Sequence, residues 1–236
     1  MNHITIIAGA RPNFMKVAPI IHEIKKRKAE GVDKDYSLVH TGQHYDENMS
    51  LSFFNELKIP KPKYNLEISG GNHGYMTGRM IEAIEEVLII EKPDWVLLYG
   101  DTNSTLAGAI SASKLNIRIA HVEAGLRSFN MKMPEEINRI MSDHVSTLLF
   151  CPTKTAISNL EKEGFSLNTD KKASIDNPHV YLCGDIMYDN SLHFSEVSAS
   201  KSKILSELDL TGNDFILVTI HRNANTDDRQ KLNDIF

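Results

Sequence analysis

The chain has 236 residues, which is enough for one large domain or for one domain and part of a second. Its 41% of hydrophobic and 24% of charged residues are ordinary for a globular protein, and its net charge of −5 argues against a nucleic-acid binder. The first residues lack the features of a secretory signal, and apolar runs such as "VLII" are too short to span a bilayer. We therefore expect a cytoplasmic protein with no membrane segment, in which Cys151 and Cys183 are reduced and buried.

Short β-branched segments alternate with segments of helical periodicity. The segment "HITIIAG" predicts a first strand, and Pro12 suits the start of the helix that follows. The segment "DWVLLYGD" is apolar on both faces, as a buried parallel strand should be. In chain order we expect strands at residues 3–9, 36–42, 94–101, 117–123, 147–152 and 179–185, and helices from residue 12 and at 75–91, 103–114, 135–146 and 153–163. This alternation predicts an α/β fold with a doubly wound, Rossmann-like parallel sheet.

The end of the chain predicts the beginning of another domain. A polar stretch after "GDIMYDN" leads to "DFILVTIHRNAN", which predicts a strand, and to "DDRQKLNDIF", which predicts a helix. One strand and one helix cannot bury a core by themselves. We therefore predict a Rossmann-like domain over residues 1–184, and over residues 185–236 a linker and the start of a second, truncated Rossmann-like domain.

Polar residues follow several predicted strands, at the edge where open α/β sheets bind ligands. Arg11 and Lys16 lie at a strand-to-helix turn that favours anions, although both could equally be solvated surface cations. Asp101 follows another strand and could simply cap the next helix. Glu123 also ends a strand, but no helical pattern follows it at once. A carboxylate is therefore harder to explain there, unless it pairs with Arg127.

The segment "MPEEINRIMSDHV" predicts an amphipathic helix that begins near Pro134. The residues expected to form its buried stripe are Ile137, Ile140, Met141 and Val145. Glu135 points away from this stripe, and Glu136 lies near its border. An i,i+4 pair between Glu135 and Arg139, together with the helix dipole, is enough to explain Glu135 without catalysis.

Two histidines, His44 and His221, each follow a predicted strand. They are candidates for ligand contacts or proton transfer, although a lone histidine is more often structural. No histidine or cysteine has a second ligand at metal-binding spacing, so we predict no metal site. Carboxylates crowded at one edge of a sheet suit proton transfer. The pattern predicts an α/β enzyme that acts on anionic small molecules, and it leaves the reaction open.

Six motifs occur together along the chain: "GARPNFMKVAPI", "TGQHYD", "YGDTNSTLAG", "HVEAGLRS", "MPEEINR" and "TIHRNAN". In this order they resemble the non-hydrolysing UDP-N-acetylglucosamine 2-epimerases over essentially the whole chain. The resemblance implies the first half of a GT-B-like fold, with the active site between two Rossmann-like domains. It also implies a UDP-sugar substrate, a homodimer when the protein is full length and a place in polysaccharide biosynthesis.

The reaction that the resemblance implies inverts C2 of the sugar. UDP is eliminated across C1 and C2 to give 2-acetamidoglucal and is then added back. By motif, the catalytic residues are Asp101, Glu123, Glu135 and His221, and the substrate-binding residues are Arg11, Lys16, Gln43, His44 and Arg139. Glu136 is expected to be only structural. No metal and no nicotinamide cofactor are implied, because the C2 hydrogen leaves as a proton. The motifs do not say which carboxylate removes that proton.

Several alternatives stay open. Relatives that epimerise UDP-2,3-diacetamido-2,3-dideoxyglucuronate look similar. A glycosyltransferase or nucleotide-sugar binding domain that does not epimerise would not need three carboxylates at one cleft. Activation by a second UDP-sugar is in doubt, because Asp46 stands where a glutamine is common. Much of the uridine and diphosphate contact in the family comes from the second domain, so the 236-residue chain alone is expected to be inactive.

Overall fold

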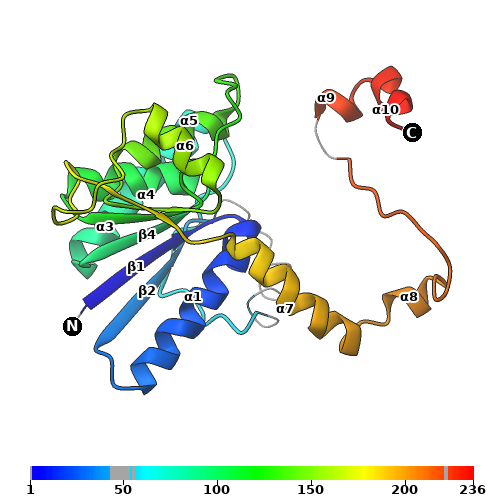
Figure 1. Cartoon of the computed structure of the whole chain (residues 1–236), viewed down its shortest axis with the longest axis horizontal. Coiled ribbons are helices and arrows are strands. Elements are labelled where there is room, and N and C mark those ends of the chain that lie inside the picture. The colour runs from blue at the N-terminus through cyan, green and yellow to red at the C-terminus, as the bar shows by residue number, and fades with distance from the viewer. Residues whose placement is uncertain (1, 43–53, 55–56, 221–222) are drawn as a thin grey trace. The chain divides into compact units, whose positions relative to one another are not determined.

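The computed structural model of the chain describes residues 2–42, 54, 57–220 and 223–236 (Figure 1). Contacts between residues divide the chain into two compact units, Met1–Leu192 and His193–Phe236, and each is described by itself. Among the helices within these described ranges, none is long and apolar enough to cross a bilayer. The domain boundary expected between residues 184 and 185 stays a prediction.

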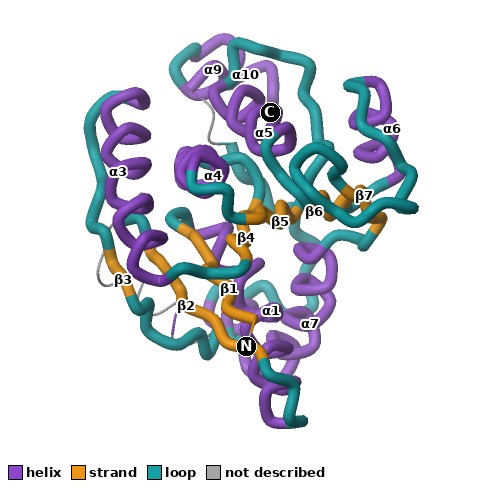
Figure 2. The backbone as a smooth tube through the Cα atoms, turned by 90° about the vertical axis from the view of Figure 1, so that its left-hand side faces the viewer, coloured by secondary structure: helices purple, strands orange, loops and turns teal. Residues whose placement is uncertain are grey.

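The first unit is built on a sheet of parallel strands in the order β3-β2-β1-β4-β5-β6-β7 (Figure 2). The strands are β1 (Asn2–Ala8), β2 (Lys34–His40), β3 (Tyr64–Asn65), β4 (Trp95–Tyr99), β5 (Arg118–Val122), β6 (Leu148–Cys151) and β7 (His179–Leu182). Strands β1 and β4 lie side by side and pair in parallel with each other. The direction in which successive strands are added to the sheet reverses between them. This confirms the predicted doubly wound, Rossmann-like sheet. Open sheets of this kind bind ligands beyond the carboxyl ends of the strands at such a reversal.

Helices cover both faces of this sheet. They are α1 (Arg11–Ala29), α3 (His73–Glu91), α4 (Asn103–Lys114), α5 (Pro134–His144) and α6 (Lys154–Lys162). The helices α3 to α6 lie on one face and α1 on the other (Figure 1, Figure 2). The first turns of α7 (Ile186–Lys201) contact α1, where the side-chain amide of Asn190 donates to the carbonyl oxygen of Met15 (2.6 Å). The sequence did not predict α7, because its apolar residues do not form one stripe and Tyr188 and Leu192 are exposed.

The core lies between the sheet and the helices α3 and α4. Buried side chains of β4 pack there with Met80, Ile84 and Leu88 of α3. Helix α4 approaches the sheet closely at Gly108, where a Cβ atom would lie 2.7 Å from a methyl group of Leu98. This packing holds the start of α4, and with it the turn after β4, in a fixed position at the edge of the sheet.

The two cysteines are not alike. Cys151 at the end of β6 is buried, and burial raises the pKa of its thiol to about 12. Cys183 is exposed, so the expectation that both thiols are buried is wrong for this residue. It follows the edge strand β7, which β6 covers on one side only.

In the second unit, the described residues form α8 (Ile204–Glu207), α9 (Asn223–Thr226), α10 (Arg229–Ile235) and the rest of α7. Helix α10 confirms the helix predicted in "DDRQKLNDIF", and the Asp228 carboxylate caps it by accepting from the backbone N–H of Gln230 (2.9 Å). The strand predicted in "DFILVTIHRNAN" is wrong over residues 214–220, where Ile216 and Leu217 are exposed. A strand needs a neighbour for its backbone, and the described part of this unit offers none.

Candidate active site

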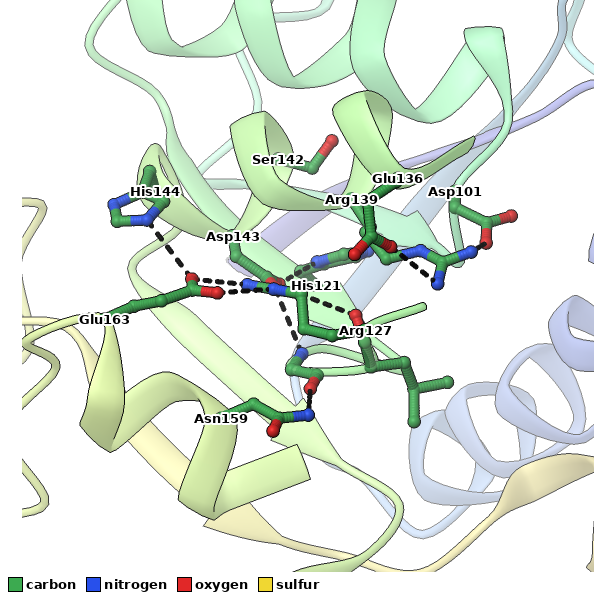
Figure 3. Close-up of polar contacts among 12 residues, drawn as sticks. Asp101, His121, Arg127, Glu136, Arg139, Ser142, Asp143, His144, Asn159 and Glu163 are labelled. Carbon is green, nitrogen blue, oxygen red and sulfur yellow. Dashed lines mark hydrogen bonds and ion pairs between the residues drawn. The ribbon is translucent and has the colours of Figure 1, made fainter. Parts of the chain in front are cut away.

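Two ion pairs mark the carboxyl-end edge of the sheet. Lys16 of α1 pairs with Glu123, the residue that follows β5. Arg139 of α5 pairs with Asp101, which lies in the turn after β4 (Figure 3). The structure therefore brings four of the predicted site residues to one edge, from helices and strand ends that are far apart in the sequence.

The pair of Lys16 and Glu123 is largely shielded from solvent, with side chains that are 10% and 15% exposed. The turn after β4 passes close by, and a Cβ atom at Gly100 would lie 3.1 Å from the Glu123 carboxylate and 3.2 Å from the Lys16 amine. Glu123 has a φ angle of +68°, in the left-handed region that non-glycine residues rarely adopt. Such strain persists only where surrounding contacts impose it, and it is concentrated at functional sites. The suggested pairing of Glu123 with Arg127 is wrong.

The turn between β1 and α1 is held against the same edge. The Asn13 side chain accepts from the backbone N–H of Ala10 (3.3 Å) and donates to the carbonyl oxygen of Tyr99 (3.2 Å), at the end of β4. A Cβ atom at Gly9 would lie 2.0 Å from the Thr41 hydroxyl and 2.2 Å from the Ser104 hydroxyl, so only glycine fits. The first turn of a long helix is thereby presented at the edge of the sheet, where its N–H groups favour an anion.

Asp101 is not the cap of α4. The N-cap is Thr102, whose hydroxyl oxygen accepts from the backbone N–H of Thr105 (3.3 Å). Asp101 remains 36% exposed beside Arg139, and the Asn138 side chain donates to its carbonyl oxygen (2.9 Å). Its carboxylate is therefore fixed by α5 but open to a ligand.

Helix α5 buries its polar face. The residues that are buried are Glu136, Asn138, Ser142 and Asp143. Ile137 and Met141 are 40% and 42% exposed, so the predicted apolar stripe is wrong at these two positions. Ile140 and Val145 are partly buried, and Val145 packs against the core. The apolar pattern failed because this helix packs on the polar turns that follow β4 and β5, which satisfy its hydrogen bonds.

The two adjacent glutamates of α5 differ sharply. Glu136 is 1% exposed and accepts from the backbone N–H groups of Ser128 (2.9 Å) and Phe129 (2.7 Å), while Arg139 lies 3.1 Å from it. Burial opposes its ionisation, but these N–H groups and the Arg139 charge outweigh burial and hold the pKa of Glu136 below its usual value. Glu135 is exposed, and Arg139 pairs with Asp101 and Glu136 instead of with Glu135 as the sequence suggested. The catalytic role of Glu135 stays a prediction.

Some predicted site residues lie outside the described part of the chain. They are Gln43, His44 and His221, together with the side chain of Arg11. Their roles in catalysis and substrate binding stay predictions. In the part that is described, no three His, Cys, Asp or Glu side chains form a group that could hold a metal ion.

A buried charge network, which was not predicted from the sequence, links β5, α5 and α6. The Nδ1 atom of His121 lies 2.7 Å from the Asp143 carboxylate (Figure 3). Its Nε2 atom lies 2.7 Å from the carbonyl oxygen of Gly100. Arg127 donates to Asp143 (2.8 Å) and, through two nitrogens, to Glu163 (2.6 and 2.7 Å). The signal in the sequence was a histidine in the middle of an otherwise apolar strand, "IRIAHVE", where burial demands polar partners.

The network has a definite charge state. Burial lowers the pKa of His121, but hydrogen bonding to Asp143 and the Asp143 charge outweigh burial, so the pKa is raised. Burial raises the pKa of Asp143, and its contacts with His121 and Arg127 outweigh this and lower it. Both partners are therefore held in their charged forms.

Comparisons with known proteins identify the family to which the chain belongs. A sequence model of the family described as UDP-N-acetylglucosamine 2-epimerase matches residues 25–236. The chain is 51% identical over 234 residues to a UDP-N-acetylglucosamine 2-epimerase homolog of Methanococcus maripaludis, covering 99% of this chain and 61% of that protein. It is also 51% identical over 235 residues to the UDP-2,3-diacetamido-2,3-dideoxy-D-glucuronate 2-epimerase of Pseudomonas aeruginosa, covering 100% of this chain and 61% of that protein.

A solved structure extends the agreement to three dimensions. The UDP-GlcNAc 2-epimerase of Methanocaldococcus jannaschii, crystallised in complex with UDP-GlcNAc and UDP, matches with a TM-score of 0.84 at 43% identity. The match covers 99% of this chain and 60% of that chain, so this chain spans about three fifths of the length of these relatives. On the sequence match and the matching parallel sheet, the chain belongs to the UDP-N-acetylglucosamine 2-epimerase family.

Proposed function

We propose that the full-length protein interconverts UDP-N-acetylglucosamine and UDP-N-acetylmannosamine by eliminating UDP and adding it back through 2-acetamidoglucal. The observation that carries this proposal is the pair of carboxylates, Asp101 and Glu123, at the ends of neighbouring strands, each held by a cation. The named relatives support it, because one of them is a UDP-GlcNAc 2-epimerase that was crystallised with UDP-GlcNAc and UDP.

The elimination needs a base for the C2 proton, an acid for its return and positive charge for the departing diphosphate. Lys16 and the first turn of α1 supply positive charge at the edge of the sheet. Asp101 and Glu123 are the described carboxylates placed for proton transfer, and Glu135 lies on the first turn of the helix that supplies Arg139. Arg11 and His221 complete the diphosphate site in this proposal, and Gln43 and His44 contact the substrate. No cofactor is invoked.

The 236-residue chain by itself is expected to be inactive. In this proposal the rest of the UDP-sugar site comes from the part of the relatives' length that this chain does not cover. Turnover by the chain alone would contradict this expectation. A cytoplasmic location, a homodimer and a place in polysaccharide biosynthesis also belong to the proposal.

A second candidate substrate is supported by a relative of equal sequence identity to this chain. The relative that is 51% identical over 235 residues is named a 2-epimerase of UDP-2,3-diacetamido-2,3-dideoxy-D-glucuronate. The described carboxylates and cations do not distinguish the two sugars, because they serve C2 and the diphosphate, which both substrates share.

The experiment incubates the full-length protein with each of the two UDP-sugars in heavy water. Epimerisation of UDP-N-acetylglucosamine requires deuterium at C2 and a UDP-N-acetylmannosamine product. Exchange with only the diacetamido uronate moves the assignment to the second candidate. Exchange with neither sugar, together with sugar transfer to an acceptor, identifies a glycosyltransferase and overturns the proposal.

A matched pair of variants tests the choice of glutamate. In the proposal, Glu135→Gln lowers kcat on the order of 100-fold or more, the range of a lost acid or base. Glu136→Gln instead lowers stability, because it weakens the bonds to the backbone of residues 128 and 129. If only Glu136→Gln abolished the exchange while the protein stayed folded, the catalytic glutamate would be misassigned.

A further inference from the structure

His121 lies on β5, between the turn that carries Asp101 and the residue Glu123, and it is fully buried. Its two ring nitrogens face two oxygen atoms, one from the Asp143 carboxylate and one from the Gly100 carbonyl, each at 2.7 Å. Neither oxygen can donate a hydrogen bond, because Asp143 is held as a carboxylate. Both nitrogens must therefore carry a proton, since a neutral ring would leave a lone pair facing an oxygen at this distance.

The surroundings balance this buried cation. Asp143 also accepts from Arg127 (2.8 Å), and Arg127 in turn pairs with Glu163 of α6, which the ring of exposed His144 approaches (3.3 Å). The carboxylate of Glu123, which follows β5, adds a further negative charge that favours the protonated ring. Each buried charge thus has an opposite partner within hydrogen-bonding distance, which is the condition under which such a network is tolerated.

The network joins the segments that carry the catalytic carboxylates. His121 holds the carbonyl group of Gly100, the residue before Asp101. Asp143 accepts from the backbone N–H of Gly125, two residues after Glu123, at 3.0 Å. Asp143 also belongs to α5, the helix whose Arg139 pairs with Asp101. Loss of one proton from His121 would leave either the Gly100 carbonyl or the Asp143 carboxylate without its hydrogen bond to the ring.

We propose that His121 is a permanently protonated positioning residue, which fixes the turns carrying Asp101 and Glu123 and transfers no proton itself. The link to catalysis rests on the proposed epimerase function, whereas the charge state and the positioning of the turns do not. His121 therefore acts through Gly100 and Asp143, and it touches neither the sugar nor the diphosphate.

The charge state is measured directly on the chain. Nuclear magnetic resonance of protein labelled with nitrogen-15 in its histidines reports the protonation of each ring nitrogen. A His121→Gln variant assigns the signals. We expect both nitrogens of His121 to be protonated at pH 7, where an ordinary histidine is mostly neutral. A neutral tautomer at pH 7 would overturn the proposal.

The positioning role is tested with Asp143→Asn, which keeps the shape of the side chain and removes its charge. The ring of His121 then becomes neutral as pH rises, because burial is no longer opposed by the carboxylate. The backbone amide signals of Asp101 and Glu123 should move over the same pH range in the variant and stay constant in the wild type. Amide signals that do not follow the ring would show that His121 does not position these turns.

Kinetics of the full-length protein give an independent measurement. His121→Gln should lower kcat on the order of 100-fold with little change in KM, as expected when reacting groups are slightly misplaced. Asp143→Asn should add a loss of kcat with rising pH that the wild type lacks. An unchanged kcat in a folded His121→Gln variant overturns the proposal. If the wild type turns over neither UDP-sugar, the proposed function fails, and the ring and amide signals still decide on His121.

His179 provides the matched control. It is 7% exposed at the start of β7, and its ring contacts the carbonyl oxygen of Lys171 (2.7 Å) and the hydroxyl of Tyr181 (3.1 Å). The hydroxyl can donate, so a neutral ring satisfies both contacts. His179→Gln should lower stability and leave kcat within about 2-fold of the wild type, since its strand end lies away from the site.

Discussion

One shielded glutamate lies near the amino ends of the strands and another lies at their carboxyl ends. The contacts and the backbone conformation of the two residues differ. Glu91 ends α3 near the start of β4, and its carboxylate contacts Lys63 (2.8 Å), Tyr64 (2.6 Å) and His3 (3.2 Å). Glu123, at the carboxyl ends of the strands, pairs with Lys16 and has a strained backbone with φ of +68°. The first arrangement favours the folded state, whereas the second holds a charged group in place at a backbone cost of about 1–3 kcal/mol.

The largest expected effect is on activity, where the two glutamates should differ most. In the full-length protein, Glu123→Gln and Asp101→Asn should each lower kcat on the order of 100- to 10,000-fold, because each removes a proposed proton-transfer group. Glu91→Gln serves as the control and should leave kcat nearly unchanged, since Glu91 lies near the opposite edge. The measurement is deuterium incorporation at C2 of the UDP-sugar. Equal losses in all three variants would mean that the activity tracks stability alone.

The next effect concerns stability. Glu91→Gln should lower the free energy of unfolding of the chain by about 1–3 kcal/mol, because the variant loses charge-assisted hydrogen bonds at a site only 5% exposed. Urea denaturation measures the change. Glu82→Gln on the same helix is the matched control, because Glu82 is exposed and should contribute less than about 0.5 kcal/mol. An equal cost for the two variants would remove the distinction between a shielded and an exposed glutamate.

The same contrast can be sharpened with pH. Burial raises the pKa of Glu91, but the contacts with Lys63 and Tyr64 outweigh burial and lower it from 4.5 to about 2. A lowered folded-state pKa contributes stability that is complete above pH 4.5 and is lost as the pH falls toward 2. The difference in unfolding free energy between wild type and Glu91→Gln should therefore shrink as the pH falls from about 4.5 toward 2. Urea curves across this range provide the measurement, and a constant difference would contradict the assignment.

The sequence predicted the sheet well because its strands are apolar runs between helices of regular periodicity. The helix at 103–114 was predicted with the bounds that α4 has. The pattern failed at α5, where the side chains that are buried are polar and Ile137 and Met141 are exposed. Periodicity identifies which residues prefer burial, but it cannot show that a neighbouring turn supplies hydrogen bonds to a polar face.

In the candidate site, too, one feature could be predicted from the sequence and another could not. Position after a strand was enough to predict that Asp101 and Glu123 lie at the same end of the sheet, because parallel strands bring their carboxyl ends together. It could not assign their partners, and the suggested pairings of Glu123 with Arg127 and of Glu135 with Arg139 were both wrong. Partner choice depends on side-chain direction across helices separated by many residues, which local spacing does not encode.

The smallest expected effect tests the polar packing of α5. Ile137→Ala should change the free energy of unfolding of the chain by less than about 0.5 kcal/mol, because the side chain is 40% exposed. Ile84→Ala on α3 is the matched substitution at a fully buried position, and it should cost about 2–5 kcal/mol through lost burial and a cavity. Urea denaturation of both variants at low protein concentration, where self-association does not contribute, gives the comparison. A cost for Ile137→Ala as large as that for Ile84→Ala would mean that α5 packs through its apolar stripe. The polar contacts with the turns after β4 and β5 would then not be what holds α5 in place.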